Sequence, residues 1–218
     1  MKLGPVDLRL RVTIARLNGG GLWIHSPTAL TAELKNQVDE LGSVTAIVAP
    51  NNAHNLWLEE WASAYPDATA YVARGIPKKR PNVAGARVID EGTAAIWSTE
   101  FQHQLMSGVP FLDESVFLHR PSKSLIVTDL VQNHGGQETT GFARVMTKLV
   151  LEPIGFKGIC FAPPLRLKFM IKDRPAFVTF IKTVEAWDFD RIIVTHGDII
   201  EDNAKDAFAG LCRRFNDG

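Results

Sequence analysis

The sequence lacks the features that mark secreted proteins and nucleic-acid-binding proteins. It has only two cysteines, and Cys160 and Cys212 lie far apart in the chain without metal-type spacing, so we expect reduced, packed thiols. No net charge attracts nucleic acid or an anionic membrane, because Lys plus Arg and Asp plus Glu number 24 each. We therefore expect no nucleic-acid partner and no membrane partner.

Long apolar runs are missing too. No stretch approaches the roughly 18 uncharged apolar residues of a membrane-spanning helix. The N-terminus, MKLGPVDLRLRV, alternates and carries charge throughout, unlike the continuous apolar segment of a signal peptide. Together these features predict a cytoplasmic location.

The chain nevertheless has enough apolar residues for a substantial core. Its 218 residues fit one large domain, and 45% of them are hydrophobic. The sequence shows no internal repeat, low-complexity run or long linker. A single domain over residues 1–218 is the prediction.

Sequence patterns predict helices toward both ends of the chain and strands between them. Alternation on both sides of Gly19–Gly21 predicts a hairpin, and apolar spacing over 30–41, ending at Gly42, predicts a helix. Strands are expected at 44–49, 68–73, 87–89, 94–98, 100–106, 115–120, 123–129 and 191–198. Further helices are expected around Trp57 and Trp61, at 138–152, at 174–187 and around 208–215.

Three of the apolar runs lead into side chains that bind metals or transfer protons. AIVAPNNAH ends in His54, SLIVTDL contains Asp129 and RIIVTHGD contains His196. In layered α/β folds, loops at strand ends converge and bind ligands, so we expect these three side chains to share one site. His25 and His119 also lie at strand ends, as further ligands or as polar residues in the cleft wall.

The order of elements resembles the metallo-β-lactamase fold. The segments SPTAL, IVAPNNAH, YPDATAYVARG, FLHRPSKSLIVTDL and WDFDRIIVTHGD look like one uncharacterised branch of it, called domain of unknown function 4336. The resemblance runs from about residue 8 to the C-terminus. It implies an α/β fold, a four-layer αββα sandwich of two mixed sheets flanked by helices.

Most metal ligands of that superfamily are missing here. Active members carry His-x-His-x-Asp-His after the second main strand, whereas this chain has NNAHNLW with only His54. Asp129 matches the bridging Asp and His196 the terminal His, but the middle His has no counterpart near SGVPFLDES. The resemblance therefore implies at most one zinc or iron ion, held by these three residues.

The amides and the three candidate ligands also have plainer explanations. Asn51 and Asn52 line the cleft or cap the following helix by accepting hydrogen bonds from backbone N–H groups. His54 and Asp129 either bind metal or only form hydrogen bonds within their loops. The sequence leaves both explanations open.

Two charged groups lie near the expected site in the sequence. Asp198 is a candidate cleft residue that orients the ring of His196. The basic loop with Lys78, Lys79 and Arg80 is either solvated or, if it borders the cleft, an anion-binding rim.

Two functions fit this pattern. The first is a metal-dependent hydrolase with a degenerate, at most mononuclear site. The second is a catalytically inactive metallo-β-lactamase-like binding or interaction module without metal. Retention of candidate ligands at three strand ends favours the first. A small-molecule ligand is the expected partner, while the sequence specifies neither the substrate nor the oligomeric state.

Overall fold

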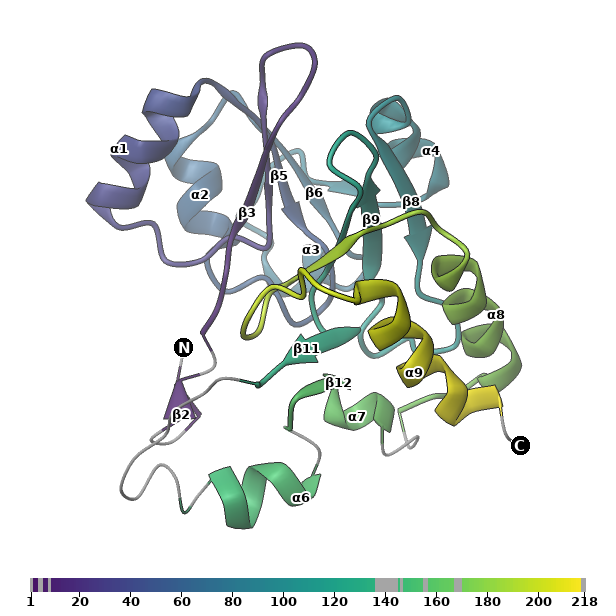
Figure 1. The fold of residues 1–218 in the computed structure, drawn as a ribbon. Helices are drawn as coiled ribbons and strands as arrows, with labels where there is room; N and C mark the ends of the chain where they lie inside the picture. Colours follow the sequence, from purple (N-terminus) through teal and green to yellow (C-terminus); the bar gives the residue numbers. More distant parts are fainter. Residues whose placement is uncertain are drawn as a thin grey trace.

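Two β-sheets face each other in the computed structural model (Figure 1). The structure describes residues 2–3, 6–7, 9–135, 145, 147–154, 157–166 and 170–216. The first sheet has the order β3 (Thr13–Arg16), β4 (Leu22–His25), β5 (Val44–Ala49), β6 (Thr69–Val72) and β7 (Arg87–Val88). The second has the order β13 (Arg191–Val194), β10 (Ser124–Val127), β9 (Ser115–His119) and β8 (Phe101–Leu105). Two short antiparallel ribbons pair β1 (Lys2–Leu3) with β2 (Val6–Asp7) and β11 (Val131–Asn133) with β12 (Ile159–Phe161).

Both large sheets are mixed, as expected. The first begins with the antiparallel β3–β4 hairpin and continues with parallel pairs from β4 to β7. In the second, β10 is parallel to β13 but antiparallel to β9. Val127 pairs with Val194 in the parallel register, so the residues two positions further on, Asp129 and His196, leave the sheet side by side.

Helices cover the outer face of each sheet (Figure 1). The elements on the side of the first sheet are α1 (Ala32–Leu41), α2 (Leu58–Ala64) and α3 (Ile76–Lys79), and the second sheet packs against α8 (Arg174–Glu185) and α9 (Ala204–Asn216). Shorter elements are α4 (Glu91–Ala94), the 3₁₀ turn η1 (Ala95–Trp97), the π-helical turn η2 (Thr147–Leu151), α6 (Glu152–Ile154) and α7 (Pro163–Arg166). No helix in the described part of the chain is long and apolar enough to cross a membrane.

The ends of α1 and the start of α8 follow from local chemistry. Thr31 Oγ1 accepts a hydrogen bond from Leu34 N at 3.2 Å, and α1 stops at Gly42, whose φ of 140° suits glycine. Asp173 caps α8 by accepting a hydrogen bond from Ala176 N at 3.0 Å. These caps fix where each helix begins or ends.

Three apolar clusters separate the four layers. Alternation along a strand sends successive side chains to opposite faces, so Trp23 lies between the sheets while Ile24 faces the helices. In the same way Ile126 lies between the sheets and Val127 packs toward α8 and α9. The middle cluster is rich in aromatic rings, including Trp23, Tyr71, Trp97, Phe101 and Phe117. The result is the four-layer αββα sandwich.

The prediction for residues 94–98 was wrong. Instead of a strand, this segment forms the end of α4 and the turn η1. Asp90 begins the helix, because its side chain accepts a hydrogen bond from Thr93 N while Thr93 Oγ1 accepts one from Asp90 N. The helix expected over 138–152 lies largely outside the described residues.

Candidate metal centre

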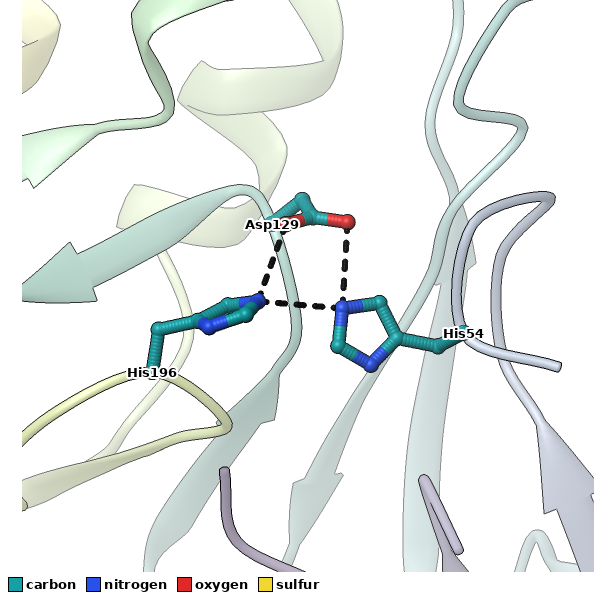
Figure 2. Close-up of side chains that lie close together, drawn as sticks. All are labelled: His54, Asp129 and His196. Carbon is teal, nitrogen blue, oxygen red and sulfur yellow. Dashed lines mark hydrogen bonds and ion pairs between the residues drawn. The ribbon is translucent and has the colours of Figure 1, made fainter. Parts of the chain in front are cut away.

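Three loops bring His54, Asp129 and His196 together, as the strand-end pattern predicts. His54 Nε2 lies 3.1 Å from His196 Nε2 and 3.3 Å from Asp129 Oδ2. His196 Nε2 lies 3.4 Å from Asp129 Oδ1. Figure 2 shows the two imidazoles and the carboxylate pointing at one another. One ligand atom from each residue faces a shared point, within 4.8 Å of the others.

These spacings fit shared coordination of one ion. Two ligands bonded at about 2.0–2.2 Å to a tetrahedral ion lie about 3.3–3.6 Å apart. The observed separations of 3.1, 3.3 and 3.4 Å lie close to that range. Two imidazoles and one carboxylate also form a donor set that suits zinc or iron. The residues present therefore fit a single metal ion.

Charge and burial balance each other in this triad. Burial alone would raise the pKa of Asp129, but the adjacent His54 and His196 rings reverse this and lower it well below its usual value. Burial opposes protonation of His54, yet the Asp129 carboxylate and the Glu114 side chain raise its pKa overall. The triad therefore carries an anionic carboxylate suited to a cation.

Asn51 does not cap the following helix as expected, because α2 begins at Leu58 and its N-cap is Trp57. Asn51 is buried and holds the loops of the site together instead. Its Oδ1 accepts hydrogen bonds from Ala53 N at 2.9 Å and His54 N at 2.8 Å, which shapes the turn after β5. Its Nδ2 donates to Asp129 Oδ2 at 2.8 Å and to Thr128 Oγ1 at 2.9 Å. One amide thus fixes both the His54 loop and the Asp129 carboxylate.

Ser26 orients His54 and was not foreseen from the sequence. Its Oγ lies 2.9 Å from His54 Nδ1, and its φ of 54° is unusual for a residue other than glycine. If His54 Nε2 binds a metal, Nδ1 has to carry the proton and donate to Ser26 Oγ. Nothing in the sequence around SPT signals this backbone conformation.

Glu114 is a second residue that the sequence analysis missed. It is completely buried, and its carboxylate accepts hydrogen bonds from the backbone N–H groups of Thr128, Asp129 and Leu130 at 2.8, 2.9 and 3.0 Å. Burial, reinforced by the charge of Asp129, raises the pKa of Glu114 to about 7. The available signal was an acid directly before a buried strand, in FLDESVFL.

The turn after β13 positions His196 by a close backbone approach. Gly197 has a φ of 92°, and a Cβ at this position would lie 1.7 Å from Asn133 O. Only glycine fits there, and Asn133 N donates to His196 O at 3.0 Å. The backbone of His196 is therefore tied to the strand that follows Asp129.

Asp198 does not orient His196 as expected. Its carboxylate binds Arg9 instead, with Arg9 Nη1 at 2.8 Å and Arg9 Nη2 at 3.2 Å. The Nδ1 atom of His196 has no hydrogen-bond partner among the described residues. The Arg9 ion pair draws the Asp198 carboxylate away from the ring.

His119 lies at the wrong end of its strand to join the site. It pairs with Ser124, the first residue of β10, whereas Asp129 follows the last. Its Nδ1 lies 2.7 Å from Ser122 Oγ. The hairpin between β9 and β10 separates His119 from the triad by the length of the strand, which corrects the sequence-based assignment.

Asn52 and the basic residues hold loops rather than line the cavity. Asn52 Oδ1 accepts from Gly75 N at 3.0 Å, and its Nδ2 donates to Phe111 O at 3.2 Å. Lys79 Nζ donates to Asn52 O at 2.6 Å, and Arg80 Nε donates to Asn55 Oδ1 at 2.9 Å. Lys78 is exposed. Anion binding by Lys78, Lys79 and Arg80 stays a prediction.

His25 belongs to the core between the sheets instead of the cleft wall. It is fully buried, stacks on Trp23 at 5.2 Å and meets Phe117 edge-on at 5.9 Å. Neither ring nitrogen has a hydrogen-bond partner among the described residues. Burial, with a smaller contribution from His54, lowers the pKa of His25 to about 3.

This lowered pKa predicts a loss of stability in acid. His25 becomes protonated near pH 6.5 in the unfolded chain but only near pH 3 in the fold, so its contribution is complete above pH 6.5 and declines as the pH falls. His25→Phe keeps an aromatic ring in the core but cannot be protonated. Between pH 7 and pH 5 we expect the free energy of unfolding of this variant to fall by about 2 kcal/mol less than that of the parent. Urea titrations at both pH values measure this difference. Equal losses in the two proteins would contradict the assignment.

A cavity of about 300 Å³ opens onto the triad. Its polar lining consists of His54, Asp129 and His196 together with Asn55 and Gln132. Gln132 Nε2 donates to Asp129 Oδ1 at 3.1 Å and thereby supports the carboxylate. The candidate metal centre is thus accessible to a small molecule.

Comparisons with known proteins agree with this architecture. A family model described as Domain of unknown function (DUF4336) matches residues 1–135. A search of curated proteins finds no match. The chain is therefore related by sequence to a family whose activity is not described.

Solved structures with the same fold include iron proteins and a metallo-β-lactamase. TTHA1623 in a di-iron-bound form has a TM-score of 0.58 and 15% identity over 97% of this chain and 96% of that one. The chemotaxis sensor ODP, solved as a peroxy diiron species, has a TM-score of 0.56 and 11% sequence identity, covering 91% of this chain and 83% of that one. A metallo beta lactamase from Erythrobacter litoralis has a TM-score of 0.54 and 11% sequence identity, covering 94% of this chain and 81% of that one. At these identities the likeness shows the fold alone.

Proposed function

The chain belongs to the family described as Domain of unknown function (DUF4336), and we propose that it is a metal-dependent hydrolase with one ion held by His54, Asp129 and His196. The observation that carries the proposal is the convergence of three ligand atoms within 4.8 Å at the floor of an open cavity. Zinc or iron suits this donor set. The di-iron form of TTHA1623, which shares the fold, supports iron as one of the two candidates.

The chain's own groups prepare the site for a cation. Asp129 supplies the negative charge, and Asn51 and Gln132 hold one oxygen each through hydrogen bonds of 2.8 and 3.1 Å. Ser26 fixes the ring of His54. A bound ion would supply Lewis-acid chemistry, polarising a carbonyl group or lowering the pKa of a water molecule. The cavity then admits the substrate to that point.

The donor count supports one ion rather than two. Among the described residues, the triad is the group of His, Cys, Asp and Glu side chains whose ligand atoms lie close enough to share a metal. The Glu114 carboxylate is engaged with three backbone N–H groups, and the amide of Asn51 is a poor ligand beside imidazole or carboxylate. Within the part of the chain that the structure describes, a second ion therefore lacks anionic and imidazole donors.

Metal loading of chelator-treated protein tests the proposal. We expect one equivalent of zinc(II) or iron(II) per chain, and an increase of about 2.7 kcal/mol in the free energy of unfolding at an ion concentration 100 times Kd. Elemental analysis and denaturant titration measure the two effects. His196→Ala, which removes one ligand, should show neither.

Other outcomes lead to different conclusions. Two tightly retained equivalents would contradict the single-ion site. No retained metal, together with unchanged stability of His196→Ala, would favour the second candidate, a catalytically inactive binding module. One observation favours that second candidate: the cavity has a mainly apolar lining, and apolar contacts hold a ligand without metal.

A further inference from the structure

The walls of the cavity above the triad are apolar. They come from five separate segments and include Leu56 and Trp57 after β5, Phe111 and Leu112 after β8, and Ala162 and Pro163 after β12. Two of these side chains are largely exposed at the surface, Phe111 by 60% and Leu56 by 55%. Large exposed apolar side chains around a concave site are typical of ligand-binding surfaces.

The polar residues of the lining outside the triad are already engaged. Asn55 Oδ1 accepts from Arg80 Nε, and its Nδ2 donates to Asn52 O at 3.0 Å. Gln132 Nε2 donates to Asp129 Oδ1, and its Oε1 lies 2.9 Å from His134 Nε2. A ligand therefore meets hydrocarbon on the walls and finds its polar partners at the triad.

Hydrogen bonds hold two of the walls in place. Asn52 N donates to Leu112 O at 2.8 Å, and Asn52 Nδ2 donates to Phe111 O at 3.2 Å. The loop that carries His54 is thereby fastened to the loop that carries Phe111. Loops fixed in this way before binding lower the ordering cost of binding a ligand.

From these features we propose that the substrate is an uncharged, largely apolar carbonyl compound, such as a hydrophobic ester, whose carbonyl group lies at the triad. The inference rests on the proposed function for the position of the reacting group. The apolar walls accept the hydrocarbon portion, and an ionised group against them would lose its hydration without compensation.

Binding to chelator-treated protein at pH 8 tests the substrate class without any metal. The probes are Nile red, an uncharged fluorophore, and methyl octanoate as its competitor, with sodium octanoate as the anionic counterpart. We expect methyl octanoate to displace the dye, with each methylene removed from its chain weakening its binding about fourfold. Octanoate should bind at least about tenfold less tightly, because its carboxylate would lose hydration against the apolar walls.

Surface variants locate the binding. Phe111 and Leu56 lie at exposed positions on the rim. Replacing either with serine should weaken the binding of Nile red and of methyl octanoate at least about fivefold. Ile96→Ser is the matched control, because Ile96 is 55% exposed, as Leu56 is, but does not line the cavity. Equal competition by octanoate, or unchanged binding in Phe111→Ser and Leu56→Ser, would overturn the proposal.

The design separates this inference from the proposed function. If the ester binds metal-free protein but the protein retains no ion, the ligand class stands and the hydrolase proposal fails. If one ion binds but the uncharged ligands do not, the ligand class fails and the metal site stands.

Discussion

Asp129→Asn is expected to weaken zinc or iron binding by at least about 100-fold. Partners that only support a ligand typically change metal affinity 10- to 100-fold, so loss of a ligating carboxylate should exceed that. Asp129 is the only anionic member of the triad, and both imidazoles lie within 3.4 Å of its oxygens. Asparagine keeps the size of the side chain but removes the charge.

Competition with a chromogenic chelator on metal-free protein measures this loss. Asp198→Asn is the matched control, because Asp198 lies two residues from His196 but binds Arg9 through a partly exposed ion pair. We expect the control to keep the parent affinity and both variants to keep the parent circular dichroism spectrum. Equal affinity in Asp129→Asn and the parent would exclude Asp129 as a ligand.

The sequence was sufficient to predict which three residues converge. Each follows a buried strand, and β10 and β13 are parallel, so equal offsets from Val127 and Val194 place Asp129 and His196 together. His54 joins them from the facing sheet. The ends of the strands, and the order of strands and helices along the chain, can be predicted because both follow from the pattern of apolar residues.

The orientation of the other candidates depended on contacts that patterns do not encode. His119 was misplaced because its position next to the turn between β9 and β10 puts it beside Ser124 rather than Asp129. Asp198 was misplaced because its partner, Arg9, comes from the other end of the chain. Long-range ion pairs of this kind are not visible in local sequence.

The residues that support the site were missed for a related reason. Ser26 reaches His54 through a backbone conformation with positive φ. Glu114 supports Asp129 by hydrogen bonds to backbone N–H groups, which every residue carries and which leave no trace in the sequence. Such partners become visible only when the loops are seen together in space.

Glu114→Gln is expected to remove a pH-dependent loss of about 3 kcal/mol in the free energy of unfolding. Three backbone N–H groups donate to the Glu114 carboxylate. Burial and the charge of Asp129 outweigh these hydrogen bonds and raise the pKa of Glu114 to about 7, so the charged carboxylate is less stable in the fold than the neutral acid. Between pH 4 and pH 8 the parent should therefore lose about 3 kcal/mol more than the variant, whose neutral glutamine does not titrate.

Glu100→Gln provides the matched control for this substitution. Glu100 is also buried, but its Oε2 accepts one hydrogen bond, from Asn18 N at 2.9 Å, which an amide oxygen can still accept. We expect the control to lose no more than about 1 kcal/mol. Guanidinium titrations at pH 4 and pH 8 measure the difference between Glu114→Gln and the parent, because Glu114, with a pKa of about 7, is neutral in the fold at the first value and charged at the second. Because the same N–H groups shape the turn at Asp129, Glu114→Gln should also weaken metal binding about 10- to 100-fold. Equal changes in the free energy of unfolding between pH 4 and pH 8 in the parent and in Glu114→Gln would contradict the raised pKa of Glu114.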